Sequence, residues 1–238
     1  MKFHLPLSPM QNDFYGSIIE TIKKYYPIGI KSSEDAYFKY PGQIELGELV
    51  IDNIHKAKNF KSRWRDFEKQ LRTDLHKKIW GETYASKPSF SSSVVIRKSK
   101  RFDLIHIKKL HFSVSLLGPY YTIYGMDETA VVDQRDGRDL FYTALNTVTV
   151  SPYKEYESSF IALRESIEKR FTGYKFIPFK LHSMLLDKLC DPYDSEKEMT
   201  IYSALFDDFL DGYNTNRRRG DDSYGTEVWI KPNQGNRF

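Results

Sequence analysis

Cysteine is almost absent from this chain of 238 residues, since Cys190 is the only one. A single thiol excludes an intrachain disulfide and a zinc site built from several cysteines. Because Cys190 follows the apolar segment LLDKL, we predict that it is a packing residue and not a nucleophile. No hydrophobic run approaches the roughly 18 residues of a membrane span, and the first residues, MKFHLPLSPMQND, lack the apolar core of a signal peptide. We therefore expect a cytoplasmic protein without membrane contact.

Recognisable motifs for catalysis are also missing. The sequence has no G-x-S-x-G nucleophile turn, no S-x-x-K pair and no phosphate-binding G-x-x-x-x-G-K loop. No two of its histidines have the i, i+4 spacing of a helical metal site, and a regular strand would send His106 and His111 to opposite faces. We predict no catalytic residue, no metal site and no cofactor, and therefore a protein that is not an enzyme.

Carboxylates leave one alternative to that prediction. Asp207 and Asp211 lie one turn apart if MTIYSALFDDFL forms a helix, a spacing that could hold a hard cation or supply an acid and a base. A further oxygen-rich segment would be needed, and DQRDGRD is the candidate. We favour a solvated helix face, but an enzyme of an unfamiliar type would gather Asp207, Asp211, Asp133 and Asp136 in a cleft.

Aromatic residues, in contrast, are abundant: 17 Tyr, 16 Phe and 3 Trp. The densest run is HFSVSLLGPYYTIYG, residues 111–125. Apolar Phe112, Val114 and Leu116 alternate with polar residues, and Gly118-Pro119 is a turn signal, so the run predicts a hairpin at the centre of a sheet. The alternative is an open stacking platform made by Tyr120, Thr122 and Tyr124.

Charge is distributed unevenly along the chain, although the formal net charge is only +4. Residues 52–110 hold 16 Lys and Arg against 6 Asp and Glu, whereas residues 111–238 hold 15 against 20. Such an asymmetry indicates a basic face that could meet an acidic partner. We favour a solvated, lysine-rich helix as the simpler explanation, and a nucleic-acid-binding face over residues 52–110 is a further alternative.

Hydrophobic periodicity predicts the elements of the fold. The order is helices, a meander of strands, a strand–helix–strand unit and final helices, which favours an α+β fold with an antiparallel sheet of about four to six strands covered by long amphipathic helices. We expect one domain over residues 1–238, with 212–238 as a flexible tail. The predicted helices cover residues 8–27, 53–80, 151–173, 182–189 and 199–210, and the predicted strands lie at 90–98, 101–117, 120–125, 128–133, 146–150 and 174–179.

The sheet segment FSVSLLGPYYTIYG, followed by the helix that opens at SPYKEYESSF, resembles in size and layout the immunity proteins that bacteria carry against polymorphic or secreted toxins. The resemblance implies a non-catalytic protein that neutralises a protein partner by occluding its active site. Inhibitors of nucleases are often acidic, so a basic chain implies an acidic target surface or contact through its acidic C-terminal half. The resemblance gives no numbered residue a role. From charge and aromatic content we select these candidate partner contacts: Arg65, Lys69, Arg72, Tyr120, Tyr124, Asp207 and Asp211.

Overall fold

A seven-stranded sheet organises the chain in a computed structural model that describes residues 3–5, 15–135, 138–213 and 215–229. The order β10-β6-β5-β4-β3-β2 is antiparallel from β6 to β2, and β10 and β7 add short parallel pairings. A second sheet has the order β1-β8-β9. The strands are β1 (Phe3–Leu5), β2 (Ile79–Gly81), β3 (Ser89–Arg101), β4 (Leu104–Ser115), β5 (Tyr120–Arg135), β6 (Arg138–Thr149), β7 (Lys175–Phe176), β8 (Met184–Asp191), β9 (Asp194–Thr200) and β10 (Arg218–Arg219).

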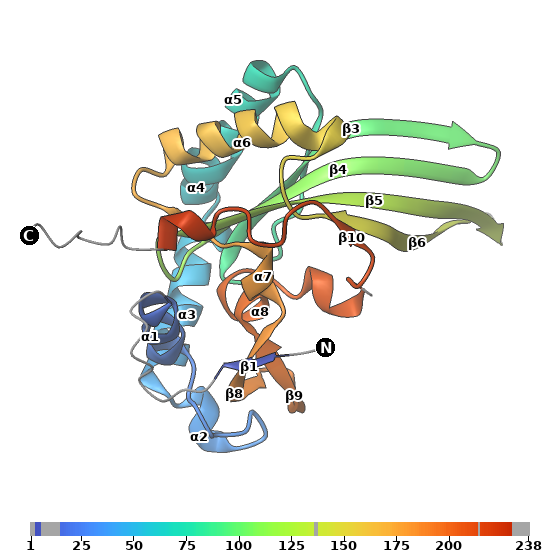
Figure 1. Ribbon diagram of the computed structural model, residues 1–238. Coiled ribbons are helices and arrows are strands. Elements are labelled where there is room, and N and C mark those ends of the chain that lie inside the picture. Colours follow the sequence, from blue (N-terminus) through green and yellow to red (C-terminus); the bar gives the residue numbers. More distant parts are fainter. Residues whose placement is uncertain (1–2, 6–14, 136–137, 214, 230–238) are drawn as a thin grey trace, which may run out of the picture.

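Helices cover one end of this sheet and leave its other end bare, so that β3 to β6 project from the body (Figure 1). The predicted α+β class, with an antiparallel sheet covered by helices, is confirmed. The α-helices are α1 (Gly16–Tyr25), α2 (Asp35–Phe38), α3 (Pro41–Val50), α4 (Ala57–Phe60), α5 (Asp66–Leu75), α6 (Glu157–Arg170), α7 (Phe179–His182) and α8 (Ile201–Leu205). Short 3-10 turns lie at Lys154–Tyr156, Phe209–Gly212 and Thr226–Trp229.

The hairpin predicted at residues 111–125 is confirmed as the centre of the sheet. β4 and β5 pair antiparallel with Phe112 opposite Ile123 and His111 opposite Tyr124. Phe112 and Ile123 face the helices α5 and α6 and join a core cluster with Trp64, because alternate residues of a strand point to one face.

The helix predicted over residues 53–80 is wrong as one continuous element. The chain leaves helical geometry at Lys56 (ψ 102°), and α5 ends at His76, whose φ of 50° is left-handed. Ile79, predicted on the helical stripe, belongs instead to β2, where it pairs with Val94. Two π-helical turns, at Ile51–His55 and Lys61–Arg65, flank α4. Three apolar residues of the predicted helix, Trp64, Phe67 and Leu71, nevertheless pack on the sheet.

The C-terminal helices predicted from HSMLLDKL and MTIYSALFDDFL are also largely wrong. The first segment forms most of β8, because β1 and β9 provide hydrogen-bonding partners on both sides. In the second, α8 is short and ends at Leu205. Its N-terminal cap is formed by Thr200 and Ser203.

The beginning and end of the chain were predicted with mixed success. The first helix spans Gly16–Tyr25, and residues 8–14 of its predicted range lie outside the described residues. In the predicted tail, Arg219 lies in β10, and the indole of Trp229 donates to the Phe176 carbonyl at 2.7 Å. Residues 230–238 also lie outside the described part.

Candidate functional site

A buried group of polar side chains covers the sheet face opposite to α5 and α6. The pattern SFSSSVV in β3 and HFSVS in β4 sends Phe90 and Phe112 to the helices and sends Ser91 and His111 to the other face. Residues 200–212 cover this second face. We define the polar cluster as Glu82, Ser91, Ser93, Lys109, His111, Ser113, Tyr124, Glu128, Tyr202 and Asp207.

His111 is the centre of the polar cluster. Its Nδ1 lies 2.8 Å from Glu82 Oε2, and its Nε2 lies 3.1 Å from Ser113 Oγ and 3.8 Å from Asp207 Oδ2. Burial alone would lower the pKa of the imidazole, but Asp207 and Glu82 outweigh it and raise the pKa of His111 to about 9. His111 is therefore a buried imidazolium at neutral pH.

The two carboxylates beside His111 remain charged. Burial favours their neutral forms, yet the contact with His111 holds the pKa of both Glu82 and Asp207 at about 2. Both oxygens of Asp207 accept hydrogen bonds: Oδ1 from the Tyr202 hydroxyl at 2.7 Å and the Phe209 amide at 3.0 Å, and Oδ2 from Ser91 at 2.9 Å. Asp207 thus fastens the segment after α8 to the sheet.

Lys109 extends the polar cluster toward β5. Its Nζ lies 3.0 Å from Glu82 Oε1 and 3.3 Å from Glu128 Oε2. Burial raises the pKa of Glu128, although the nearby Lys109 opposes that shift. Phe209 stacks on His111 with an interplanar angle of 9° and lies under the Lys109 ammonium, which closes the top of the cluster.

The geometry of the polar cluster favours a structural role over catalysis. His111 and Asp207 are fully buried, and the side chain of Glu82 is 18% exposed. Its ionised groups are paired with one another, so a reacting molecule would have to displace Phe209 and break existing ion pairs. Burial also raises the pKa of the Cys190 thiol, which disfavours the nucleophilic thiolate.

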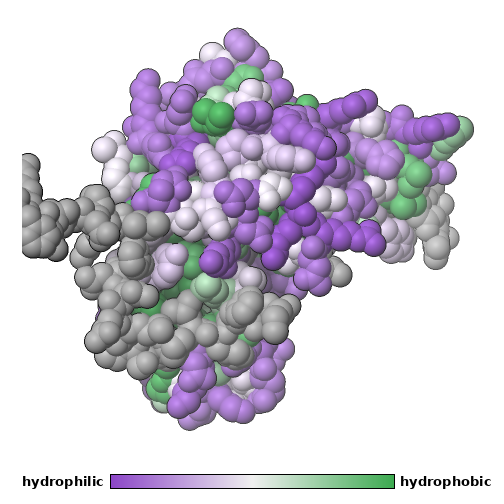
Figure 2. Space-filling view, in the orientation of Figure 1, coloured by the Kyte–Doolittle hydropathy of each residue, from purple (hydrophilic) through white to green (hydrophobic). Residues whose placement is uncertain are grey.

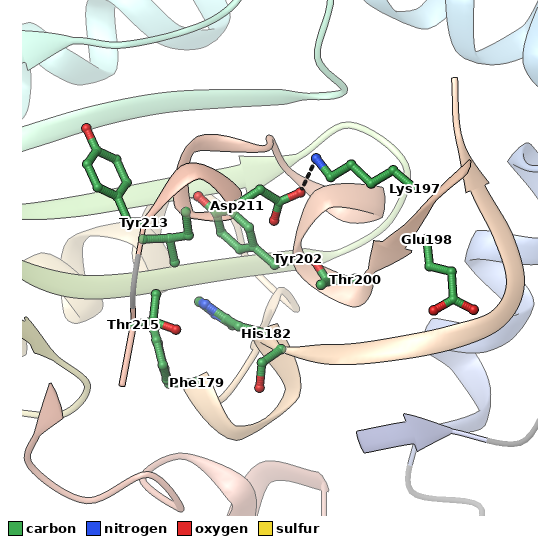
Figure 3. Close-up of a pocket in the computed structure, with 11 residues that line it drawn as sticks. Phe179, His182, Lys197, Glu198, Thr200, Tyr202, Asp211, Tyr213 and Thr215 are labelled. Atoms are coloured by element: carbon green, nitrogen blue, oxygen red, sulfur yellow. Dashed lines mark ion pairs between the residues drawn. The ribbon is translucent and has the colours of Figure 1, made fainter. Parts of the chain in front are cut away.

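A small cavity of about 140 Å³ lies beside the polar cluster, next to Tyr202 (Figure 3). His182 lines it, and burial lowers the pKa of this imidazole to about 3, so the ring is neutral. Its Nε2 lies 2.6 Å from Thr122 Oγ1, whereas its Nδ1 meets no hydrogen-bond partner among the described residues. Asp211, on another wall, is paired with Lys197 at 2.9 Å. The ion pair with Lys197 therefore compensates the charge of the Asp211 carboxylate at this wall.

The predicted pairing of Asp207 with Asp211 is wrong. The two lie beyond the end of α8, so helical spacing does not apply to them. Asp207 is buried in the polar cluster, and Asp211 faces the cavity with Lys197. The side chains of Asp133 and Asp136, the other carboxylates of that alternative, lie outside the described part of the structure.

The tyrosines predicted to contact a partner are buried. Tyr120 is 3% exposed and donates to the Ser17 carbonyl at 2.9 Å, and Tyr124 is fully buried against Tyr202. The selection of Tyr120, Tyr124 and Asp207 as surface contacts is therefore wrong. The open stacking platform fails for the same reason, because α1 and residues 200–206 cover that face.

The predicted basic contacts do lie at the surface. Arg65, at the end of the second π-helical turn, and Lys69 of α5 are more than half exposed, with loose contacts to Glu68 at 3.6 Å and to Asp66 at 3.8 Å. Arg72 on the same helix is exposed. Their role in binding a partner stays a prediction.

The basic residues of the hairpin do not continue that surface as one stripe. In the ladder between β3 and β4, Arg97 lies opposite Lys108 and Arg101 lies opposite Leu104, on the face toward α5. Lys98 lies opposite Ile107 and Lys100 lies opposite Ile105, on the other face. Lys108 is occupied by Asp127 and Glu155. These cations therefore do not form the single continuous basic surface that is typical of nucleic-acid binding.

Sequence reasoning missed an exposed apolar row on the projecting end of the sheet. We define the projecting end as residues 97–107, 128–131 and 142–145 of β3 to β6, whose side chains the structure describes. Leu104 pairs with Val131, and Val131 pairs with Tyr142, so the three share one face on adjacent strands. They are 41%, 39% and 56% exposed, and Phe102 at the turn is 82% exposed. Figure 2 shows hydrophobic surface among hydrophilic surface at this end of the molecule. The segment RKSKRFD, with Phe102 among charges, was the available sequence signal.

Fold and site together define an α+β protein with a closed polar cluster and a projecting, partly apolar sheet. No family model, curated protein or solved structure matches the chain. Within the described ranges, no helix is long and apolar enough to cross a membrane. In the same residues, no group of three or more His, Cys, Asp or Glu is arranged to hold a metal ion.

Proposed function

We propose that this chain is a non-catalytic binding protein that occludes a protein partner with the projecting end of its sheet. The observation that carries the proposal is the row of Leu104, Val131 and Tyr142, exposed on three adjacent strands with Arg101 beside it on the fourth. Protein interfaces concentrate their binding energy in such aromatic and arginine anchors, surrounded by polar residues.

The edge strand of the projecting end, β3, favours contact with a partner through the face of the sheet over pairing of its edge with a strand of the partner. On its outer side, β3 pairs with β2 at Ser92 to Val94, and the Val95 amide donates to the Lys78 carbonyl. Among the described residues, no strand pairs with this side of β3 beyond that point. This free edge carries Arg97, Lys98, Lys100 and Arg101. Charged side chains on an edge strand oppose pairing with another chain, so the apolar row on the face is the better contact.

Charge indicates the kind of partner. The cations around the row favour a partner with an acidic rim, and opposite charges accelerate association. Toxin neutralisation, which the sequence resemblance implies, is the specific form that we propose for this activity. It is supported by the exposed row and by the closed polar cluster, which offers no accessible reactive group.

The proposal is tested by comparing the wild type with a Leu104→Asp, Tyr142→Asp variant as baits in the native host. Ile44→Asp is the matched control, because Ile44 is 53% exposed on α3, away from the projecting end. We expect one stoichiometric protein with the wild type and the control, and at least a tenfold lower yield with the double variant, roughly a 1.4 kcal/mol loss of binding. The recovered protein should be toxic when expressed alone and harmless when co-expressed with the wild type.

Two results would contradict the proposal. One is recovery of the same partner by the double variant in undiminished yield. The other is binding of the wild type to generic DNA or RNA at about micromolar strength in about 150 mM salt, abolished by the combined Arg65→Glu, Lys69→Glu, Arg72→Glu substitution. That second result would favour the nucleic-acid alternative.

A further inference from the structure

A second, larger cavity lies on the side of the sheet that faces α5 and α6, and it shares no lining residue with the polar cluster. Its volume is about 340 Å³, and its walls come from the segment before α5, from the ends of β4 and α6, and from Tyr174. Its polar and aromatic lining residues include Asn53, Arg63, Arg170, Phe90, Phe171 and Tyr174. We call this cavity the arginine pocket.

The charge of the arginine pocket is positive and uncompensated. Arg63 and Arg170 line it, none of its lining residues is acidic, and neither guanidinium forms an ion pair with a described carboxylate. Asp52, in the same π-helical turn as Asn53, lies 2.7 Å from Lys56, and its pKa is lowered first by Lys56 and less by Arg63.

Most donors of the two guanidinium groups remain available. Arg63 Nη1 donates to Asn53 Oδ1, and Arg170 Nη2 donates to the Ser62 carbonyl at 3.0 Å. Each guanidinium has five N–H donors in a planar fork that matches a carboxylate or a phosphate. The described hydrogen bonds thus fix the orientation of each guanidinium group and use only some of its N–H donors.

The backbone around the arginine pocket is unusual in the same place. Asn53 lies in one π-helical turn and Arg63 in the other, and their side chains join the two turns. The side-chain amide of Asn53 also donates to the Leu49 carbonyl at 2.8 Å, which stabilises the π-helical turn. π-helical turns are rare and occur frequently at functional sites. Here the two turns set the position of Arg63 at the pocket wall.

The remaining walls are suited to a flat apolar group. Phe90 and Phe171 line the cavity, and Tyr174 adds a ring and a hydroxyl. Burial raises the pKa of the Tyr174 hydroxyl, which keeps it protonated and able to donate a hydrogen bond. Aromatic walls with a few convergent polar donors are typical of small-molecule sites.

We propose that the arginine pocket binds a small organic anion, in which a carboxylate or a phosphate monoester is attached to a flat apolar ring. The two arginines would receive the anionic oxygens, and Phe90, Phe171 and Tyr174 would enclose the ring. This inference goes beyond the binding function of the projecting end and does not depend on it, because the two regions share no residue.

Four probes separate the parts of this proposal in calorimetric titrations of the full chain. Phenyl phosphate and benzoate combine an anion with a ring, inorganic phosphate lacks the ring, and benzyl alcohol lacks the charge. We expect saturable 1:1 binding of phenyl phosphate or benzoate with a dissociation constant of about 1 mM or lower. Inorganic phosphate and benzyl alcohol should bind at least tenfold more weakly than the better of the two. The preference between the first two identifies which anion the pocket takes.

Substitutions locate the site. Arg170→Gln should weaken binding of the better probe at least tenfold, and Arg63→Lys should weaken it as well, because lysine keeps the charge and loses the planar fork. The matched control is Arg72→Gln, an exposed arginine of α5 that does not line the cavity. Circular dichroism and thermal unfolding establish that each variant is folded, and Arg170→Gln, at an exposed position, tests the proposal if Arg63→Lys unfolds.

Three outcomes would overturn the proposal. The first is no saturable binding of either aromatic anion at about 10 mM. The second is equal binding of benzyl alcohol, which would show an apolar site that ignores charge. The third is an unchanged affinity in Arg170→Gln or an equal loss in Arg72→Gln, which would place the bound anion elsewhere and leave Arg63 as a purely structural link between the π-helical turns.

Discussion

Leu104 and Phe112 lie on the same face of β4, yet Phe112 is fully buried and Leu104 is 41% exposed. Between them this face carries His106 and Lys108, so the apolar alternation around Phe112 does not extend without a break to Leu104. The difference lies in what covers them: α5 and α6 pack over Phe112, whereas the sheet at Leu104 projects beyond these helices (Figure 1). One strand thus serves the core at one end and presents a surface at the other.

The sharpest way to test this comparison is to truncate both side chains. Phe112→Ala should lower the free energy of unfolding by about 3–5 kcal/mol, because it empties a fully buried aromatic site. Leu104→Ala should lower it by less than about 1 kcal/mol, since the side chain is already partly in water. Urea unfolding of the two variants measures the contrast. Similar losses would show that the projecting end is covered in solution.

The opposite face of the sheet supplies a second contrast, between two aspartates. Asp207→Asn should cost about 3 kcal/mol, because it leaves the buried imidazolium of His111 with one carboxylate fewer. Asp211→Asn should cost less than about 1 kcal/mol, since its partner Lys197 is 40% exposed. An equal cost for both would mean that the polar cluster is open to water. Hydrolase activity of the wild type on esters, phosphodiesters or peptides, lost in the folded Asp207→Asn protein, would revive the enzyme alternative.

The raised pKa of His111 predicts how stability depends on pH. A histidine whose pKa rises from 6.5 to about 9 on folding stabilises the protein fully below pH 6.5, and this contribution is lost as pH rises through about 9. The free energy of unfolding should therefore fall by about 2 kcal/mol between pH 7 and pH 9.5. In His111→Gln that decrease should be largely absent. A flat profile in the wild type would show that His111 is neutral in the folded state.

These contrasts also show which parts of the molecule could be predicted from sequence. The hairpin at residues 111–125 was predictable, because its alternation and its Gly-Pro turn are local signals. The polar face of that hairpin was misjudged, because alternation shows that two faces differ but not that one is wet. Ser91, His111 and Ser113 are buried because distant residues after α8 cover them.

Non-local pairing explains most of the other errors. The apolar residues of the segment HSMLLDKL have helical spacing, but the segment pairs with β1 and β9 and forms most of β8. The break at His76 frees Ile79 for β2, where it pairs with Val94. The arginine pocket was not predictable either, because it joins residues from α6 with residues from two π-helical turns far away in the sequence.

The smallest expected effect concerns salt and the exposed cations at the start of α5 and along it. If Arg65, Lys69 and Arg72 only steer the partner, raising the salt concentration from about 50 to 300 mM should slow association modestly and leave the dissociation rate unchanged. Surface plasmon resonance with the recovered partner measures both rates. A steep fall in affinity with salt would indicate a phosphate-rich ligand instead.

Hydrogen–deuterium exchange of the protein alone and in complex with its recovered partner shows which surface the partner covers. We predict slower exchange on binding in residues 97–107, 128–131 and 142–145, with residues 200–212 over the polar cluster unchanged. Protection confined to residues 200–212 or to α5, with the projecting end exchanging as fast as in the free protein, would contradict binding through the projecting end.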